Sequence, residues 1–371
     1  MSSTALKSTS PRVDSVEVSA YTVPTDFPES DGTIEWKKTT IVIAEANCGK
    51  AAGMGYTYAD ASTAKLISSH LKDVVEGRDA MDVAGSWLAM IQSVRNLGQR
   101  GIASMAISAV DVALWDLKAK LLGLPLVKLI GGVRSGIPVY GSGGFTSYSL
   151  DQIRSQLSGW TRSGIRMVKM KVGRKPEDDP RRVRAAREAI GENPELFVDA
   201  NGAYNRKQAL ALAFQFRELG VTWFEEPVSS DDLEGLRLMR DRGPAGMAIA
   251  AGEYGYYAGY FRRMLEAGAV DVLQADATRC GGVTGFLQAS ALCTAHSMQI
   301  SAHTAPALHA HLCCAALNAI HLEYFHDHVR IENMLFDGVQ QPRNGELVPD
   351  VSRPGLGVSL KRNDAKRFEV H

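Results

Sequence analysis

The sequence predicts an α/β fold in which a (β/α)₈ barrel, residues 135–330, follows an α+β domain, residues 1–134. Two observations predict the barrel. From Ile137 onward, short apolar segments alternate with longer amphipathic segments, which is typical of parallel strands joined by helices. There are eight such units, the number that closes a barrel with its active site at the carboxyl ends of the strands. The expected strands begin near Ile137, Arg166, Leu196, Val221, Met247, Val270, Gln299 and His321.

An open, doubly wound sheet is the alternative for a chain of alternating strands and helices. That fold usually carries a glycine-rich turn of the form G-x-G-x-x-G after its first strand. The glycine cluster at residues 141–144 does not match this form. The barrel is therefore the preferred prediction.

The N-terminal domain is expected to combine strands and helices. Residues 13–48 alternate in the manner of strands, interrupted by a polar loop from Asp26 to Glu35. Residues 61–122 carry apolar side chains at helical spacing. After the barrel the regular alternation stops, and we expect the tail, residues 331–371, to pack back on the N-terminal domain.

Composition and charge exclude several classes of protein. The 371 residues are 45% hydrophobic and 22% charged, which excludes an intrinsically disordered chain. Lysine plus arginine and aspartate plus glutamate both number 41, so there is no basic excess to bind nucleic acid or an anionic membrane. No apolar run is long enough to span a bilayer, and residues 1–11 lack the apolar core of a signal peptide. We therefore expect a cytoplasmic protein.

Three acids follow three consecutive predicted strands. Asp199, Glu225 and Glu253 each stand where a strand should end, so all three are expected at one rim of the barrel. Each alone has an ordinary alternative: Asp199 as a helix N-cap, Glu225 as a solvated loop charge and Glu253 as part of a surface turn. Together they would repel one another unless a cation compensates, and carboxylate oxygens favour Mg²⁺. The set therefore predicts a magnesium site.

Lys169 and Lys171 end the preceding strand and point to the same side of it. Two neighbouring ammonium groups disfavour each other's protonation, so each lowers the pKa of the other toward neutral. Such a lysine can act as a general base. The alternative is a pair of solvated lysines at the rim.

The sixth and seventh strands end at Asp276 and His303, and the eighth contains Glu323. An aspartate beside a histidine orients the imidazole and raises its basicity. A glutamate on the eighth strand would face the lysines across the barrel, and it could stay protonated if it is desolvated. The alternatives are a structural histidine and an ordinary salt bridge.

At these positions the sequence resembles the enolase superfamily, mandelate racemase subgroup. The resemblance extends over roughly residues 13–360. It is carried by the segment Ala106–Asp116, the spacing from Asp199-Ala200-Asn201 to Glu225-Glu226-Pro227, the Lys-x-Lys pair, Gly252-Glu253, the stretch from Asp276 to Gly285, His303 and Glu323.

The resemblance implies a role for each of these side chains. Mg²⁺, or Mn²⁺ in its place, would be held by Asp199, Glu225 and Glu253. Lys171, with Lys169 beside it, would be one acid/base, and His303 with Asp276 the second on the opposite face. Glu323 would donate to a substrate carboxylate. The N-terminal domain would cap the barrel mouth through loops 26–36 and 53–58, and the supporting or substrate-contacting residues would be Asn201, Glu226, Tyr56 and Arg279.

The chemistry implied by the resemblance is removal of a proton next to a carboxylate, giving an enediolate. Because both Lys-x-Lys and the His-Asp pair are present, the resemblance implies dehydration of an acid sugar to a 2-keto-3-deoxy acid, and the polar first cap loop also suits a polyhydroxy substrate. The alternatives are a racemase or epimerase of a 2-hydroxy acid, a lactone cycloisomerase, and a binder of sugar acids without activity. The expected partners are a small hydroxy-carboxylate and further copies of the chain, in a dimer or an octamer.

Overall fold

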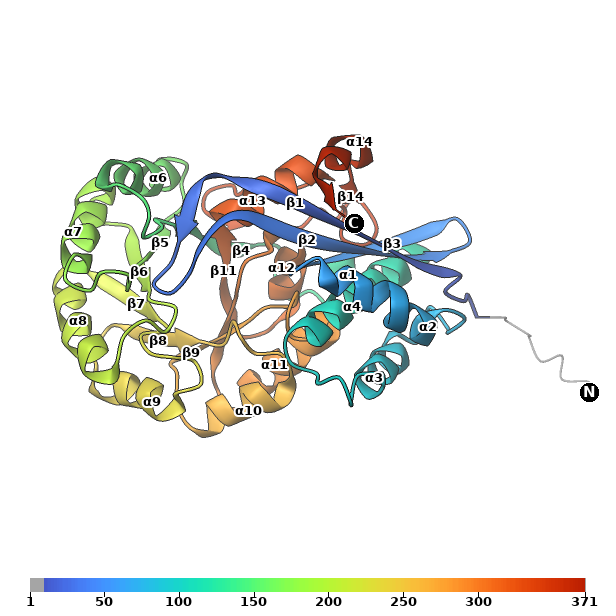
Figure 1. The fold of residues 1–371 in the computed structure, drawn as a ribbon, viewed down its shortest axis with the longest axis horizontal. Coiled ribbons are helices and arrows are strands. Elements are labelled where there is room, and N and C mark those ends of the chain that lie inside the picture. The colour runs from blue at the N-terminus through green and yellow to red at the C-terminus, as the bar shows by residue number, and fades with distance from the viewer. Residues whose placement is uncertain (1–9, 371) are drawn as a thin grey trace, which may run out of the picture.

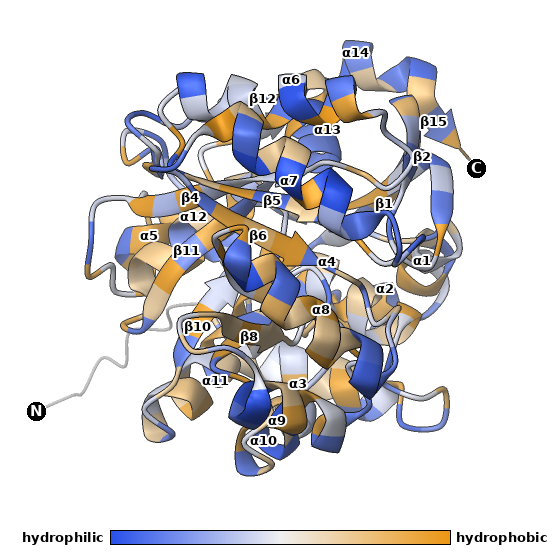
Figure 2. Ribbon diagram, turned by 90° about the vertical axis from the view of Figure 1, so that its left-hand side faces the viewer, coloured by the Kyte–Doolittle hydropathy of each residue, from blue (hydrophilic) through white to orange (hydrophobic). Residues whose placement is uncertain are grey.

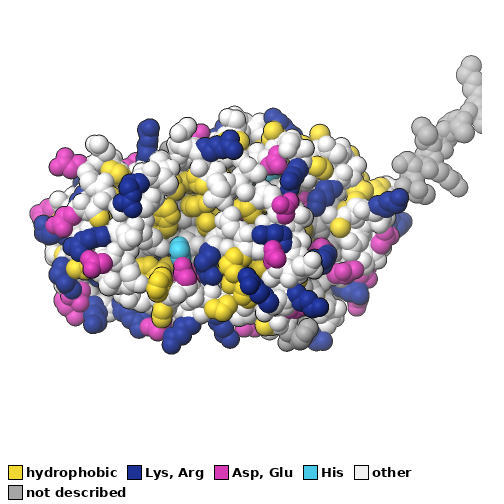
Figure 3. All heavy atoms as spheres, turned by 90° about the horizontal axis from the view of Figure 1, so that it is seen from above, with side chains coloured by type: hydrophobic (Ala, Val, Ile, Leu, Met, Phe, Trp, Pro, Cys, Tyr) yellow, Lys and Arg dark blue, Asp and Glu magenta, His cyan; other side chains and the backbone are white. Residues whose placement is uncertain are grey.

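The computed structural model describes residues 10–370 and consists of a barrel covered by a cap (Figure 1). The predicted absence of a signal peptide falls mainly on residues 1–9, outside the described residues. Among the described residues, no helix is long and apolar enough to cross a membrane. The basic and acidic side chains on the face shown in Figure 3 are interspersed, as the zero net charge leads one to expect.

The predicted barrel is confirmed. Eight parallel strands pair in sequence order, and β11 closes the ring by pairing with β4. Each begins within two residues of its predicted start. Their bounds are β4 Ile137–Gly143, β5 Met167–Lys171, β6 Glu195–Asp199, β7 Val221–Glu225, β8 Ala248–Ala251, β9 Val272–Ala275, β10 Gln299–Ala302 and β11 Ala319–Phe325.

A ring of helices surrounds the strands. Their polar faces turn outward, while the strands inside are mostly apolar (Figure 2). Capping boxes start α6 at Ser149 and α8 at Asn205, where the N-cap side chain and a glutamine three residues later satisfy backbone donors. The barrel helices are α6 Leu150–Arg162, α7 Asp179–Ile190, α8 Arg206–Glu218, α9 Leu233–Arg242, α10 Ala258–Glu266, α11 Gly282–Ala295 and α12 Pro306–Ala315.

The cap is an antiparallel sheet packed on helices. Its first two strands form a long hairpin that reaches over the barrel (Figure 1). The sheet contains β1 Ser15–Ser30, β2 Glu35–Cys48 and β3 Ala51–Tyr58. The helical elements are α1 Ser62–Leu66, η1 Ile67–Leu71, α2 Lys72–Val75, α3 Val83–Ser93, α4 Ile102–Leu121 and α5 Leu126–Leu129.

Two expected cap loops are largely strand. The polar segment 26–35 is mostly the end of the β1–β2 hairpin, and only residues 31–34 lie between the two strands. The segment 53–58 lies inside β3. Its glycines resemble a turn in the sequence, but they allow close packing on α4: a Cβ on Gly55 would lie 2.2 Å from the Ala109 carbonyl oxygen. Both loop predictions were therefore wrong in their extent.

The tail packs on both parts of the molecule. Strand β15, Glu369–Val370, pairs with β1 of the cap, and β13, Glu346–Leu347, pairs with β4 of the barrel. Between β11 and the chain end lie α13 His326–Leu335, β12 Phe336–Asp337, β14 Ser359–Leu360, α14 Arg362–Ala365 and η2 Lys366–Phe368.

Candidate active site

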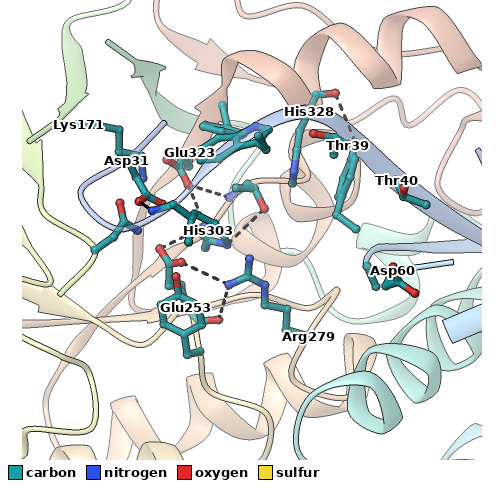
Figure 4. A pocket seen from close by; sticks show the side chains of 18 of the residues that line it. Asp31, Thr39, Thr40, Asp60, Lys171, Glu253, Arg279, His303, Glu323 and His328 are labelled. Atoms are coloured by element: carbon teal, nitrogen blue, oxygen red, sulfur yellow. Dashed lines mark hydrogen bonds and ion pairs between the residues drawn. The ribbon is translucent and has the colours of Figure 1, made fainter. Parts of the chain in front are cut away.

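A pocket of about 390 Å³ opens between the carboxyl ends of the barrel strands and the cap (Figure 4). Its barrel side contains acids, a lysine and a histidine, and its cap side combines polar side chains with the apolar Ile34 and Trp36. The residues that line it are Asp31, Ile34, Trp36, Lys38, Thr39, Thr40, Tyr58, Ala59, Asp60, Lys171, Asn201, Glu253, Tyr254, Arg279, His303, Thr304, Glu323, Phe325 and His328.

The structure brings the three predicted acids together. Asp199 ends β6, Glu225 ends β7 and Glu253 follows β8, so neighbouring strands deliver them to one rim. One carboxylate oxygen of each lies within 4.8 Å of those of the other two, and all three side chains are buried. Burial and the nearby Asp199 raise the pKa of Glu225 well above its usual range, because the negative charges repel one another.

Both lysines point into this group of acids. Lys169 Nζ lies 2.5 Å from Glu225 Oε1 and 2.8 Å from Glu323 Oε1, and Lys171 Nζ lies 2.5 Å from Asp199 Oδ2. Burial lowers the pKa of Lys171, the adjoining Asp199 carboxylate raises it and Lys169 lowers it again; the net shift is upward. Lys169 alone acts as the sequence predicts and lowers the pKa of Lys171, but in this arrangement the Asp199 carboxylate, 2.5 Å from the ammonium group, outweighs that effect.

Glu323 on β11 contacts Lys169 on β5; only β4 lies between their strands, so the predicted position across the barrel was wrong. Its Oε1 also accepts from the Ser142 hydroxyl at 2.5 Å, and its Oε2 accepts from the Thr304 backbone N–H at 3.1 Å. Burial raises the pKa of Glu323, but the positive charges of Lys169 and His303 lower it by more, so the net shift is downward. The sequence allowed a desolvated Glu323 to stay protonated; in this arrangement Lys169 instead favours its charged form.

His303 and Asp276 form the predicted pair. His303 Nδ1 lies 2.9 Å from Asp276 Oδ2, and both side chains are buried. The hydrogen bond from His303 lowers the pKa of Asp276 against the opposing effect of burial, so the aspartate stays ionised. His303 Nε2 is the nitrogen left for the pocket, 3.4 Å from Glu253 Oε2. The pair thus presents one imidazole nitrogen beside the acids.

Of the four supporting candidates, two line the pocket. Arg279 Nη1 lies 3.4 Å from Glu253 Oε1 and its Nε lies 3.5 Å from Asp276 Oδ2. Asn201 also faces the pocket, and its Oδ1 has no hydrogen-bond partner. Asn201 and Glu226 both have a positive φ, 45° and 38°, and such strain in non-glycine residues clusters at functional sites.

The prediction that Tyr56 contacts substrate was wrong. Its ring is fully buried in the core, and its hydroxyl donates to Glu332 Oε1 at 2.6 Å. Tyr56 lies on the same side of β3 as Tyr58 and contacts it edge to face, with 6.0 Å between ring centroids, but only Tyr58 lines the pocket. Tyr58, two residues later, does reach the pocket, where it stacks on His328 with 3.3 Å between ring centroids.

The donor set fits a divalent cation. Glu253 Oε2, Glu226 Oε1 and Asn201 Oδ1 are buried oxygens without a hydrogen-bond partner. Six buried acids meet there with three permanently basic side chains and the His303 imidazole, so acidic groups outnumber basic ones. The acids are Asp199, Glu225, Glu226, Glu253, Asp276 and Glu323, and the bases are Lys169, Lys171 and Arg279. Oxygen donors among an excess of acidic groups match the preference of Mg²⁺.

Several pocket residues escaped the sequence analysis. Lys38, Thr39 and Thr40 belong to β2, Asp60 follows β3, and His328 lies in α13. No local motif marks them, since the cap and barrel meet only in the folded chain. Tyr254 and Thr304 carried a usable signal, because each directly follows a residue already selected at a strand end.

Comparison with known proteins gives the family context of this site. Residues 18–131 match the family model "Mandelate racemase / muconate lactonizing enzyme, N-terminal domain". Residues 152–365 match the model "Enolase C-terminal domain-like".

Two curated relatives align over nearly the whole chain. L-talarate/galactarate dehydratase of Salmonella typhimurium is 32% identical, over 97% of this chain and 92% of that protein. The 3,6-anhydro-alpha-L-galactonate cycloisomerase of Streptomyces coelicolor is 31% identical, over 96% of this chain and 99% of that protein.

Solved structures share the fold. A mandelate racemase/muconate lactonizing enzyme-like protein from Rubrobacter xylanophilus has a TM-score of 0.95 and 56% identity, covering 97% of this chain and 100% of that chain. A racemase from Streptomyces coelicolor A3(2) with bound magnesium has a TM-score of 0.91 and 29% identity, covering 96% of this chain and 100% of that chain.

Proposed function

We propose that this chain, which belongs to the mandelate racemase/muconate lactonizing enzyme family of the enolase superfamily, dehydrates an acid sugar to a 2-keto-3-deoxy acid. One observation carries the proposal. Two candidate proton-transfer groups, Lys171 and His303, line one pocket beside a cluster of three acids. Their strands, β5 and β10, are separated by β11 and β4 on one side of the ring and by four strands on the other. They can therefore act on a substrate from different sides.

The cofactor of this chemistry is Mg²⁺, for which Asp199, Glu225 and Glu253 are the proposed ligands. When bound, the cation would supply positive charge that stabilises the enediolate, and so would favour loss of the proton from the α-carbon. Arg279 contacts Glu253 and would orient it. Lys169, held between Glu225 and Glu323, keeps a fixed positive charge in the barrel interior.

The proton movements fall to two side chains. Lys171 Nζ, in its neutral form, takes the proton from the α-carbon, and the C–H electron pair moves toward the carboxylate. His303 Nε2, in its protonated form, gives a proton to the β-hydroxyl, whose C–O bond breaks to release water. The resulting enol then rearranges to the 2-keto acid. Asp276 holds His303 through Nδ1 and stabilises the imidazolium charge.

The pocket lining supports a polyhydroxy substrate. Its cap side offers hydrogen-bonding groups on β2 and beyond it, including Lys38, Thr39, Thr40 and Asp60. An aryl substrate would favour an apolar wall in their place. The name of the Salmonella relative, a dehydratase of sugar diacids, points the same way.

The second candidate is racemisation or epimerisation of a 2-hydroxy acid, with lactone cycloisomerisation as a variant. The two bases favour it, because protonation by the group opposite to the abstracting one inverts the α-carbon. The names of the magnesium-bound racemase structure and of the cycloisomerase relative belong to these reactions. A binder without activity is disfavoured, because every predicted proton-transfer position is filled.

A screen of acid sugars with Mg²⁺ and detection of 2-keto acids tests the proposal. A dehydratase forms a 2-keto acid from at least one library member. A racemase instead returns substrate as both epimers, with solvent deuterium at the α-carbon in D₂O. A binder gives neither product nor exchange.

We also propose a homo-oligomer, dimer or octamer, that works in the cytoplasm. The oligomer rests on the family resemblance. The five cysteines are free, as is usual in a reducing compartment. Light scattering tests the first point, and a monomer mass at working concentration contradicts it.

A further inference from the structure

His309, on α12, joins the two loops that carry the His303–Asp276 pair. Its Nε2 lies 2.9 Å from the backbone nitrogen of Ala277, the residue after Asp276. Its Nδ1 lies 2.7 Å from the backbone oxygen of Thr304, the residue after His303. The imidazole is fully buried against the ring of Phe286 and does not line the pocket.

These two contacts determine the tautomer of His309. The Ala277 N–H can only donate, so Nε2 must be the acceptor. The Thr304 carbonyl can only accept, so Nδ1 must carry the hydrogen. A doubly protonated ring would place two donors face to face at Ala277. His309 is therefore a neutral bridge with one donor and one acceptor, each matched to a single backbone group.

The bridge acts where the backbone is strained. Thr304 and Ala305 have positive φ values of 54° and 42°, a region that non-glycine residues rarely adopt. Such a conformation persists only where the surroundings hold it. The bond from His309 to the Thr304 carbonyl is one restraint on this turn, and the turn directly follows His303.

We infer that His309 is a positioning residue that holds His303 in register with Asp276. The inference rests on the proposed function for its kinetic consequence. The His303 backbone N–H also donates to the Ala275 carbonyl at 3.0 Å, so the bridge is an added restraint between the loops after β9 and β10. Without it, the Thr304 turn is held less firmly and the His303 Nδ1–Asp276 Oδ2 contact loosens. Steps that need His303 should then slow, while proton removal by Lys171 on the far side continues.

The chain provides a matched control two residues away on the same helix. His311 is also buried, and it also bridges two backbone groups: its Nδ1 lies 3.2 Å from the Val127 nitrogen and its Nε2 lies 3.1 Å from the Leu356 oxygen. Neither partner adjoins a proposed proton-transfer residue. Removing this bridge should affect folding stability but not the balance between the two reaction steps.

The test compares His309→Phe with His311→Phe in the Mg²⁺-loaded enzyme, using an acid sugar found by the screen. For each variant, α-proton exchange in D₂O and 2-keto acid formation are measured together. We expect His309→Phe to lower elimination on the order of 10²-fold, the scale of a misplaced reacting group, while exchange changes several-fold at most. His309→Asn, which can keep a donor toward Thr304, should recover part of the elimination. In His311→Phe the ratio of the two rates should stay that of the wild type.

Equal losses of both rates in His309→Phe, with a ratio like that of His311→Phe, would overturn the inference and make His309 merely structural. If the phenylalanine variant does not fold, His309→Gln and His309→Asn replace it. A ¹⁵N NMR spectrum of histidine-labelled wild-type enzyme, assigned by loss of a signal in His309→Gln, tests the geometry without any substrate. A His309 signal with Nε2 protonated refutes the bridge. Absence of turnover by the wild type counts against the proposed function, whereas this spectrum still decides the bridge.

Discussion

Lys169 on β5 and Glu323 on β11 form a buried ion pair past the intervening strand β4, with 2.8 Å between Lys169 Nζ and Glu323 Oε1. Lys169 also contacts Glu225 and lies 3.4 Å from Asp199, so acids surround its ammonium group. Lys171, by contrast, has one carboxylate partner, Asp199, and faces the pocket. This asymmetry supports the proposal that Lys171 transfers the proton and that Lys169 keeps a fixed charge.

Replacing Lys169 should therefore cost stability. In Lys169→Met, Glu323 and Glu225 lose their shared cation and remain buried, and breaking a buried pair costs about 3–5 kcal/mol. Adding Glu323→Gln to Lys169→Met should return part of that loss, because one uncompensated charge is removed. Urea unfolding of the single and double variants measures both effects. If Lys169→Met is as stable as the wild type, the ion pair is not a significant restraint.

Removal of divalent metal should abolish activity. The acids at Asp199, Glu225 and Glu253 are proposed to hold the ion, so EDTA should stop turnover and added Mg²⁺ should restore it. Glu253→Gln should bind Mn²⁺ more weakly by electron paramagnetic resonance, whereas Glu192→Gln, at an exposed position, should bind it normally. Full turnover by metal-stripped enzyme would contradict the metal assignment.

The buried Glu332 should make stability depend on pH. Burial raises its pKa from 4.5 to about 8, partly offset by hydrogen bonds from Tyr56 and Ala307. The native state therefore keeps a proton that the unfolded chain has lost between these two values. Stability contributed by this group is fully present below pH 4.5 and is lost as the pH rises to about 8, by at most ~1.4 kcal/mol per pH unit.

Glu332→Gln should flatten this dependence, since the amide does not titrate. Urea midpoints of the wild type and the variant at several pH values between 5 and 8 provide the comparison, with Glu192→Gln as the exposed control. Identical slopes for the wild type and Glu332→Gln would show that Glu332 is ionised throughout this range.

The sequence was sufficient for the barrel and for the acids on it, because strand ends are local features. Asp199 and Glu225 end runs of mostly buried apolar residues. The regular alternation of strands and helices, together with the place of each acid at a strand end, predicts that both lie at one rim of the barrel. The extent of β3 was not predictable in the same way. In the sequence, Gly53 and Gly55 are typical of a turn. Their role in close packing becomes visible only in the folded chain, where α4 packs against them.

The charge states of the site residues also could not be predicted from the sequence. The pairing of Lys171 with Asp199, and of Glu323 with Lys169, depends on distances of a few ångströms between side chains on different strands. The contribution of β2 to the pocket through Thr39 and Thr40 depends on how the cap sits on the barrel. A single sequence does not encode these contacts in any local pattern.

The central claim is that Lys171 and His303 carry separate proton transfers from two sides of one substrate. NMR of a turned-over acid sugar in D₂O tests it most directly, using Lys171→Ala and His303→Asn. We expect His303→Asn to lose elimination but still to exchange the α-proton, whereas Lys171→Ala should lose both, each loss being about 10²- to 10⁴-fold, with metal binding retained. Exchange that survives in Lys171→Ala but not in His303→Asn would reverse the two roles. Near-normal elimination in both variants would contradict the account.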